Sequence, residues 1–84
     1  MTLSKLTDVT TETYWIQDNY LMDIQTSEIG YEAYIYNSIY GVKMLCVGIP
    51  KTQQTYEEFI DLVSYDTNIK NWISAYEQDY IAKE

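Results

Sequence analysis

Apolar and polar side chains alternate with a period of two through much of the first fifty residues, which predicts β-strands. Residues 12–17 are rich in β-branched and aromatic side chains and end at an Asp-Asn turn pair. Residues 20–25 place Tyr, Met and Ile on one face and Leu, Asp and Gln on the other, which indicates a second strand. Residues 26–30 close this strand, and we expect Gly30 to take a positive φ angle there.

The clearest strand pair comprises residues 31–37 and 42–49, which flank a loop of hairpin length. Pro50 lacks a backbone N–H group and should end the second of these strands. If Asn37 pairs with Val42, the expected cross-strand pairs are Ile35 with Met44, Ala33 with Cys46, Tyr36 with Lys43, Tyr34 with Leu45, and Glu32 with Val47. A shift by one residue would exchange the two faces of the hairpin.

In this register both faces of the hairpin are partly apolar. One face suits a core and carries Ala33, Ile35, Val42, Met44 and Cys46. The opposite face carries Tyr34, Tyr36, Leu45 and Val47. It stays uncovered unless the N-terminal segment or a second copy of the chain lies over it.

After Pro50 the apolar period becomes helical. Thr55 and Glu58 form a capping box, in which each side chain accepts a hydrogen bond from the backbone N–H of the other residue. A second helix is expected to start at Asp66 or Thr67. The predicted apolar stripes are Tyr56, Phe59, Ile60 and Val63 in the first helix, and Ile69, Trp72, Ile73, Tyr76 and Tyr80 in the second.

Together these elements predict an α+β fold, with an antiparallel meander of three or four strands and then two C-terminal helices packed on one face of the sheet. We expect a single domain over residues 1–84, with the meander in 12–50 and the helices in 54–82. The pattern of residues 1–11 allows a strand, a helix or irregular structure. Their apolar side chains recur every three residues, as in a helix, but the neighbouring threonines resist its extension.

Charge and composition exclude several functions. The chain has 84 residues, of which 13 are acidic and 5 are lysine, so its net charge is −8, and it contains neither arginine nor histidine. A negative charge of this size repels nucleic acids and anionic membranes. The usual neutral-pH general base and the commonest metal ligand are both missing. We therefore expect no catalytic residues, no cofactor and no metal site.

The single cysteine, Cys46, cannot form an internal disulfide and lies within an apolar run. We expect a packed thiol there rather than a nucleophile. A chain of this length without disulfides fits a reducing compartment, and its first residues lack the apolar core of a signal peptide. No stretch reaches the roughly 18 apolar residues of a membrane span. The sequence therefore predicts a cytoplasmic protein.

Acidic residues and tyrosines indicate a protein-binding surface. Residues 52–84 hold seven acidic and two basic side chains, against six and three in residues 1–51. Tyrosine gives a large contact area at a low entropy cost, and the chain has ten of them. The expected partner-binding residues are Glu57, Glu58, Asp61, Asp66, Glu77 and Asp79, which supply charge, and Tyr34, Tyr36 and Tyr65, which supply anchoring contacts.

Small size, acidity, abundant tyrosine and the Thr-Tyr-Glu-Glu-Phe segment at residues 55–59 together make the chain resemble the small inhibitors of bacterial defence that phages and mobile elements encode. Anti-CRISPR and anti-restriction proteins are examples. The resemblance is one of type and contains no alignable motif. It implies that the acidic side chains mimic nucleic-acid phosphates and block the basic cleft of a nuclease or effector complex in the cytoplasm of a bacterial host.

Two other hypotheses fit the same residues. An immunity protein or antitoxin would neutralise a basic toxin by binding at an exosite. A structural or regulatory module would associate with itself, as a homodimer through the uncovered sheet face, and its acidity would then have no specific part. Salt should weaken the first two kinds of complex and leave the third nearly unchanged.

Overall fold

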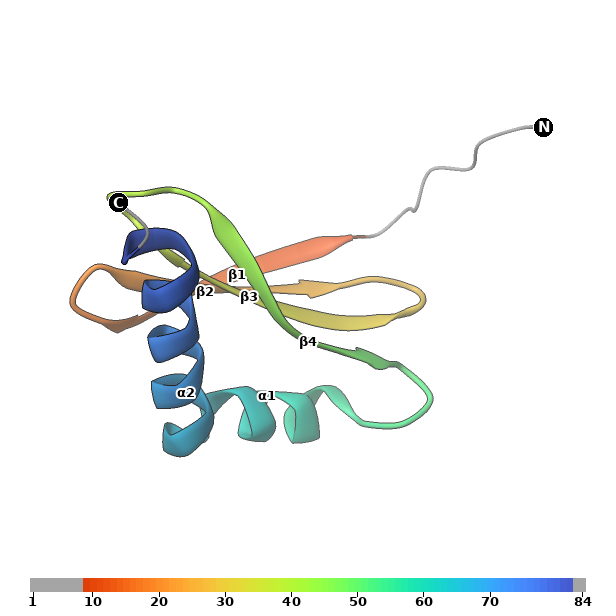
Figure 1. Cartoon of the computed structure of the whole chain (residues 1–84). Helices are drawn as coiled ribbons and strands as arrows, with labels where there is room; N and C mark the ends of the chain where they lie inside the picture. The colour runs from red at the N-terminus through yellow and green to blue at the C-terminus, as the bar shows by residue number, and fades with distance from the viewer. Residues whose placement is uncertain (1–8, 83–84) are drawn as a thin grey trace.

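The computed structural model of the chain describes residues 9–82. Its elements are β1 (Thr10–Gln17), β2 (Tyr20–Thr26), β3 (Gly30–Asn37), β4 (Lys43–Pro50), α1 (Tyr56–Ser64), α2 (Asp66–Tyr76) and a π-helical turn, η1 (Glu77–Ile81). The strands form one antiparallel sheet in the order β1-β2-β3-β4, and both helices lie on the same side of it (Figure 1). The predicted α+β fold, a meander followed by two C-terminal helices, is confirmed. Of residues 1–11, which the sequence left open, Thr10 and Thr11 belong to β1, and residues 1–8 lie outside the described residues.

The core lies between the helices and one face of the sheet. Period-two alternation directs every second side chain of β2 and β3 toward the helices, and the helical stripes meet them. The buried apolar residues are Tyr20, Met22, Ile24, Tyr31, Ala33 and Ile35 from the sheet, and Phe59, Val63, Ile73 and Tyr76 from the helices. Burying each large apolar side chain contributes about 1.5–3 kcal/mol, so this face supplies most of the stability.

Helix α1 begins at the capping box that its sequence predicts. The Thr55 hydroxyl accepts a hydrogen bond from the Glu58 backbone N–H at 3.2 Å. In return, the Glu58 carboxylate accepts one from the Thr55 backbone N–H at 2.9 Å. The reciprocal bonds satisfy two backbone donors that have no partner within the helix.

Strand β4 contains a bulge that changes the predicted register. The pairs Ile35–Met44, Tyr36–Lys43 and Tyr34–Leu45 are confirmed. Beyond them the register shifts, so Ala33 lies opposite Val47 and Glu32 opposite Gly48, and the predicted Ala33–Cys46 and Glu32–Val47 pairs are wrong. A bulge puts two residues of one strand against one of its partner, and Cys46 is the extra residue here. Val47 therefore packs against the core instead of lying on the uncovered face.

The loop before β4 also differs from the prediction. The Asn37 carbonyl accepts hydrogen bonds from the backbone N–H groups of Tyr40 and Gly41, at 3.1 and 2.8 Å. These turn bonds replace the expected pairing of Asn37 with Val42. Val42 precedes β4 and is 48% exposed, so the prediction that it belongs to the core was wrong.

The second helix ends differently from its predicted stripe. At η1 the backbone widens to i→i+5 hydrogen bonding, and the Ala82 N–H donates to the Glu77 carbonyl at 2.7 Å. The wider turn brings Ile81, rather than Tyr80, against the core. Tyr80 is exposed and lies with its ring 4.9 Å from that of Tyr76.

Gly30 is required for close packing and not for a positive φ angle. In residues 9–82 the residues with positive φ are Asp18, in the β1–β2 turn, and Gly41. A Cβ atom on Gly30 would lie within 3.0 Å of the Ile49 carbonyl oxygen and 3.1 Å from the Pro50 Cα. Backbone atoms of a paired strand cannot move aside cheaply, so only glycine fits.

We therefore expect Gly30→Ala to destabilise the fold by about 1–3 kcal/mol, the usual cost of overpacking. Gly48→Ala is the matched control, because the nearest atom to its added Cβ would be the flexible Glu32 side chain at 3.6 Å. Urea unfolding followed by circular dichroism measures both free energies. Equal stability of the two variants would contradict the assignment.

Candidate protein-binding surfaces

A shallow groove beside α1 and α2 brings together three of the predicted partner-binding residues. Glu58 and Asp61 come from α1, and Tyr65 connects the two helices. Helical periodicity places positions 58, 61 and 65 on one flank. All three side chains are exposed, and Tyr65 is 62% exposed. Gln54, Leu62 and Asn68 complete the lining.

The groove offers hydrogen-bond acceptors in excess. Besides the Glu58 and Asp61 carboxylates, the groove contains the Gln54 Oε1 atom. This atom is buried and has no hydrogen-bond partner among the described residues. The Asn68 side-chain amide already donates to the Leu62 carbonyl at 2.8 Å. No lysine in residues 9–82 forms an ion pair with Glu58 or Asp61. The groove therefore suits a group that brings donors and positive charge.

The other four predicted acidic residues also lie on the helical side of the sheet. Glu57 lies on α1, and Asp66, at the start of α2, pairs with Lys70 at 3.1 Å on the surface. Such exposed pairs contribute little. Glu77 and Asp79 lie in η1, at the other end of α2 (Figure 1). Because an 11-residue helix is about 16 Å long, the acids form two separate groups rather than one cluster.

Tyr34 and Tyr36 lie on the sheet face that points away from the helices, as the predicted register implies. They are partly buried among neighbouring strands, and the Lys43 ammonium lies 5.4 Å from the Tyr36 ring centre. Partial burial and then the neighbouring Glu32 carboxylate raise the pKa of Tyr34. The nine predicted residues are thus divided between the two sides of the sheet.

A buried carboxylate on this same face was missed by the sequence analysis. Asp23 is only 3% exposed, and its two oxygens bind the Lys43 ammonium at 2.6 Å and the Thr13 hydroxyl at 2.7 Å. The hydrogen bond and charge of Asp23 raise the pKa of Lys43. The period-two pattern placed Asp23 on the correct face, but finding its partners on β1 and β4 required the register of all four strands.

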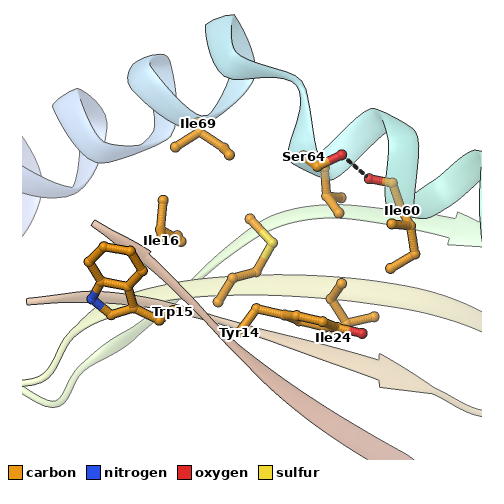
Figure 2. A pocket seen from close by; sticks show the side chains of 9 residues that line it. Tyr14, Trp15, Ile16, Ile24, Ile60, Ser64 and Ile69 are labelled. Carbon is orange, nitrogen blue, oxygen red and sulfur yellow. Dashed lines mark hydrogen bonds between the residues drawn. The ribbon is translucent and has the colours of Figure 1, made fainter. Parts of the chain in front are cut away.

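An apolar pocket of about 270 Å³ lies between β1 and β2 on one side and the helices on the other (Figure 2). Tyr14 and Ile16 line it from β1, and Ile60 and Ile69 line it from the helices. The Ser64 hydroxyl, the polar group on the helical wall, donates to the Ile60 carbonyl at 2.7 Å. The pocket therefore offers shape and apolar contact but no charged group for chemistry.

At one end of the pocket, tyrosines tie β1 to α1. The Tyr56 hydroxyl donates to the Glu12 carboxylate at 2.7 Å, and the Tyr14 hydroxyl donates to its other oxygen at 3.2 Å. The Tyr14 and Tyr56 hydroxyls also lie 3.4 Å apart, and this hydrogen bond, followed by burial and the bond to Glu12, raises the pKa of Tyr56. The Glu12 side chain is thus held toward the helical side.

Cys46 has the environment of a packed thiol. It is partly buried against the cluster around Ile35 and Tyr76, and burial raises its pKa to about 11. Within residues 9–82 no group of three or more Cys, Asp or Glu side chains could hold a metal ion. Among the helices of the same range, none has the length and apolar character needed to cross a membrane.

We expect Cys46 to react slowly with a thiol reagent such as DTNB. A pKa near 11 instead of 9.0 lowers the thiolate fraction at pH 8 about a hundredfold, and the thiolate is the reacting species. Stopped-flow absorbance should show fast labelling in urea and slow labelling of the folded chain. Similar rates in both states would contradict the packed-thiol assignment.

Glu58 should make stability depend on pH. The Thr55 backbone hydrogen bond, followed by the Thr55 side chain, holds the pKa of Glu58 below its ordinary 4.5. A lowered folded-state pKa stabilises the fold above pH 4.5, and this contribution disappears as pH falls through the lower folded value. Wild type should therefore exceed Glu58→Gln in urea stability at pH 7 but not at pH 3.

Glu57→Gln is the matched control for this pH dependence. It removes the same charge from the same first turn, but Glu57 does not take part in the capping box. We expect the stability difference between wild type and Glu57→Gln to change less between pH 7 and pH 3 than the difference between wild type and Glu58→Gln. A Glu58→Gln difference that is equal at the two pH values would contradict the capping assignment.

The described surface thus offers an acidic groove, a mixed sheet face and an apolar pocket. Comparisons with protein-family models, curated proteins and solved structures gave no match. The charge and geometry of these three features therefore carry the information about function.

Proposed function

We propose that the chain is a small inhibitor that binds protein, and that its acidic helical side occupies the basic nucleic-acid-binding cleft of a nuclease or effector complex. The observation that carries the proposal is the unneutralised charge of this side. Of the six predicted acidic residues, Asp66 alone has a lysine partner among residues 9–82. The proposal places the chain in the cytoplasm of a bacterial host.

A comparison of the exposed acidic side chains with the buried Asp23 supports this role for them. Asp23 is buried and already bound to Lys43 and Thr13, so its charge is satisfied internally. Glu58 and Asp61 instead face a groove whose polar groups are mostly acceptors. Lysine or arginine side chains of a partner would supply donors and opposite charge there. Complementary charge of this kind speeds association and orients the partner.

The spacing of the acids supports mimicry of a phosphate backbone. The group around the groove and the group in η1 lie at opposite ends of α2, a helix about 16 Å long. Phosphates on one DNA strand recur every 3.4 Å along the axis, so this span corresponds to roughly five base pairs. Exposed Tyr65 adds an aromatic anchor beside the acids. An immunity protein that binds an exosite would use the same groups without displacing DNA.

The first test is capture of partners from a bacterial lysate on the immobilised chain at ~50 and ~500 mM salt, because screening weakens such contacts. We expect a basic nucleic-acid-binding protein at low salt only, and we expect the chain to displace labelled DNA from it. Capture that persists at high salt would contradict the proposal. Binding that leaves DNA bound would replace the mimic with an exosite inhibitor.

Charge reversal should localise the contact. We expect Glu57→Lys combined with Asp61→Lys to weaken capture at least tenfold while preserving the fold, since Glu58 and its capping bonds remain. Asp61→Lys and Glu32→Lys form a matched pair of single reversals, because both carboxylates are exposed but Glu32 lies on the opposite sheet face. Equal effects of the two would show that net charge alone governs binding and would contradict a defined site.

A further inference from the structure

Strand β1 is an edge of the sheet, and its outer side is open. It spans eight residues, of which all but Ile16 are exposed. An edge strand presents unpaired backbone N–H and C=O groups, to which another strand can add. Natural sheets usually protect such an edge with lysine, proline or a bulge that interrupts the ladder.

The two edges of this sheet are protected to very different degrees. Strand β4 carries Lys43 at its start, the bulge at Cys46, and Pro50 at its end. β1 has no lysine or proline, and its irregularity lies at its last residues, between Trp15 and Gln17. Its one charged side chain, Glu12, is held by tyrosine hydroxyls on the helical side. The first six residues of β1 are therefore a regular and unprotected edge.

The hydrogen bonds of β2 identify which groups of β1 point outward. Just before β2, the Asn19 carbonyl accepts a hydrogen bond from the Ser38 backbone N–H, and just after it the Ser27 N–H donates to the Gly30 carbonyl. Because these directions alternate along a strand, the odd-numbered positions of β2 direct their backbone groups to β3. Even-numbered positions direct theirs to β1, where Met22 pairs with Tyr14. Along β1, the backbone groups of Glu12 and Tyr14 therefore face β2. Those of Thr11 and Thr13, which alternate with them, point to the open side of the edge.

We propose that β1 pairs with β1 of a second copy of this chain, antiparallel about a two-fold axis between the two Thr13 residues, so that two four-stranded sheets become one. In this register each Thr13 exchanges both backbone hydrogen bonds with its copy, and Glu12 lies opposite Tyr14. An axis at Glu12 would place like charges directly opposite each other, which is unfavourable. The segment is therefore self-complementary about Thr13.

This arrangement also covers apolar surface that the monomer exposes. Residues that pair directly lie on the same face, so both helical layers lie on one side of the joined sheet. Tyr14 and Trp15 are 41% and 69% exposed and border the pocket beside β1. The helix-facing side chains of the second copy would lie next to Tyr14, and its Thr11 would lie opposite Trp15 on the other face of the sheet. An isologous contact of this kind closes as a dimer.

The dimer and the proposed docking to a basic partner use different surfaces of the chain and respond to salt in opposite ways. Each copy carries a net charge of −8, so the copies repel each other at low salt. Screening should therefore strengthen the dimer and weaken docking to a basic surface. Sedimentation velocity of the wild-type chain at rising concentration, at ~50 and ~500 mM salt, should show a dimer that tightens with salt. A monomer at all concentrations up to ~500 μM would overturn the proposal.

Disulfide trapping tests the register. In a Cys46→Ala background, Thr13→Cys should give a covalent dimer on mild oxidation, because directly paired Cα atoms lie about 5.5 Å apart. Thr11→Cys is the matched control on the same strand and face. It lies opposite Trp15 of the second copy, roughly 14 Å along the strands from its own counterpart, and should not crosslink. Equal crosslinking of the two variants would overturn the register.

A proline substitution tests the edge without cysteine chemistry. Thr11→Pro removes an outward N–H group and leaves the bonds between β1 and β2 in place, whereas Thr11→Val removes only the hydroxyl. Circular dichroism confirms that each variant is folded. We expect the dimer dissociation constant of Thr11→Pro to exceed that of Thr11→Val at least tenfold. Equal constants would overturn pairing through β1.

Discussion

The whole structure depends on burying one face of the four-stranded sheet beneath two short helices. Helices of 9 and 11 residues are marginal alone, and the chain's single cysteine excludes an internal disulfide. Phe59 and Val63, with Ile73 and Tyr76, therefore fix the helices by inserting into the sheet face formed by β2 and β3. The capping box at Thr55 sets where this packing begins.

That single packing constraint determines where charge appears on the surface. Once one stripe of α1 is buried, its carboxylates must face solvent, and the acidic groove follows from the helical period. The opposite sheet face has no such cover among the described residues and shows a different chemistry. There, Asp23 is neutralised by Lys43, and Tyr34 and Tyr36 surround the pair. The two sides of the sheet therefore suit different partners.

The sequence predicted the features that depend on neighbouring residues. The strands, the Thr55 capping box and the exposure of the helical acids all follow from local period and spacing. The sequence did not predict the bulge at Cys46 or the shift from Tyr80 to Ile81, because both are settled by how strands and helices meet. The same holds for Gly30, whose role comes from the carbonyl of a paired strand. Of the candidate site, the exposed acids could be predicted, whereas the groove and the buried Gln54 Oε1 atom within it required the tertiary structure.

The two proposals are linked through charge. Pairing at β1 brings together two chains that each carry −8, and this repulsion opposes the dimer. A basic partner on the helical side of one chain would neutralise part of that charge without touching β1. Binding of the partner should then favour the dimer, and by linkage the dimer should bind the partner more tightly. Two acidic helical layers on one side of a joined sheet would also engage two basic patches at once, which raises avidity without any new contact within either chain.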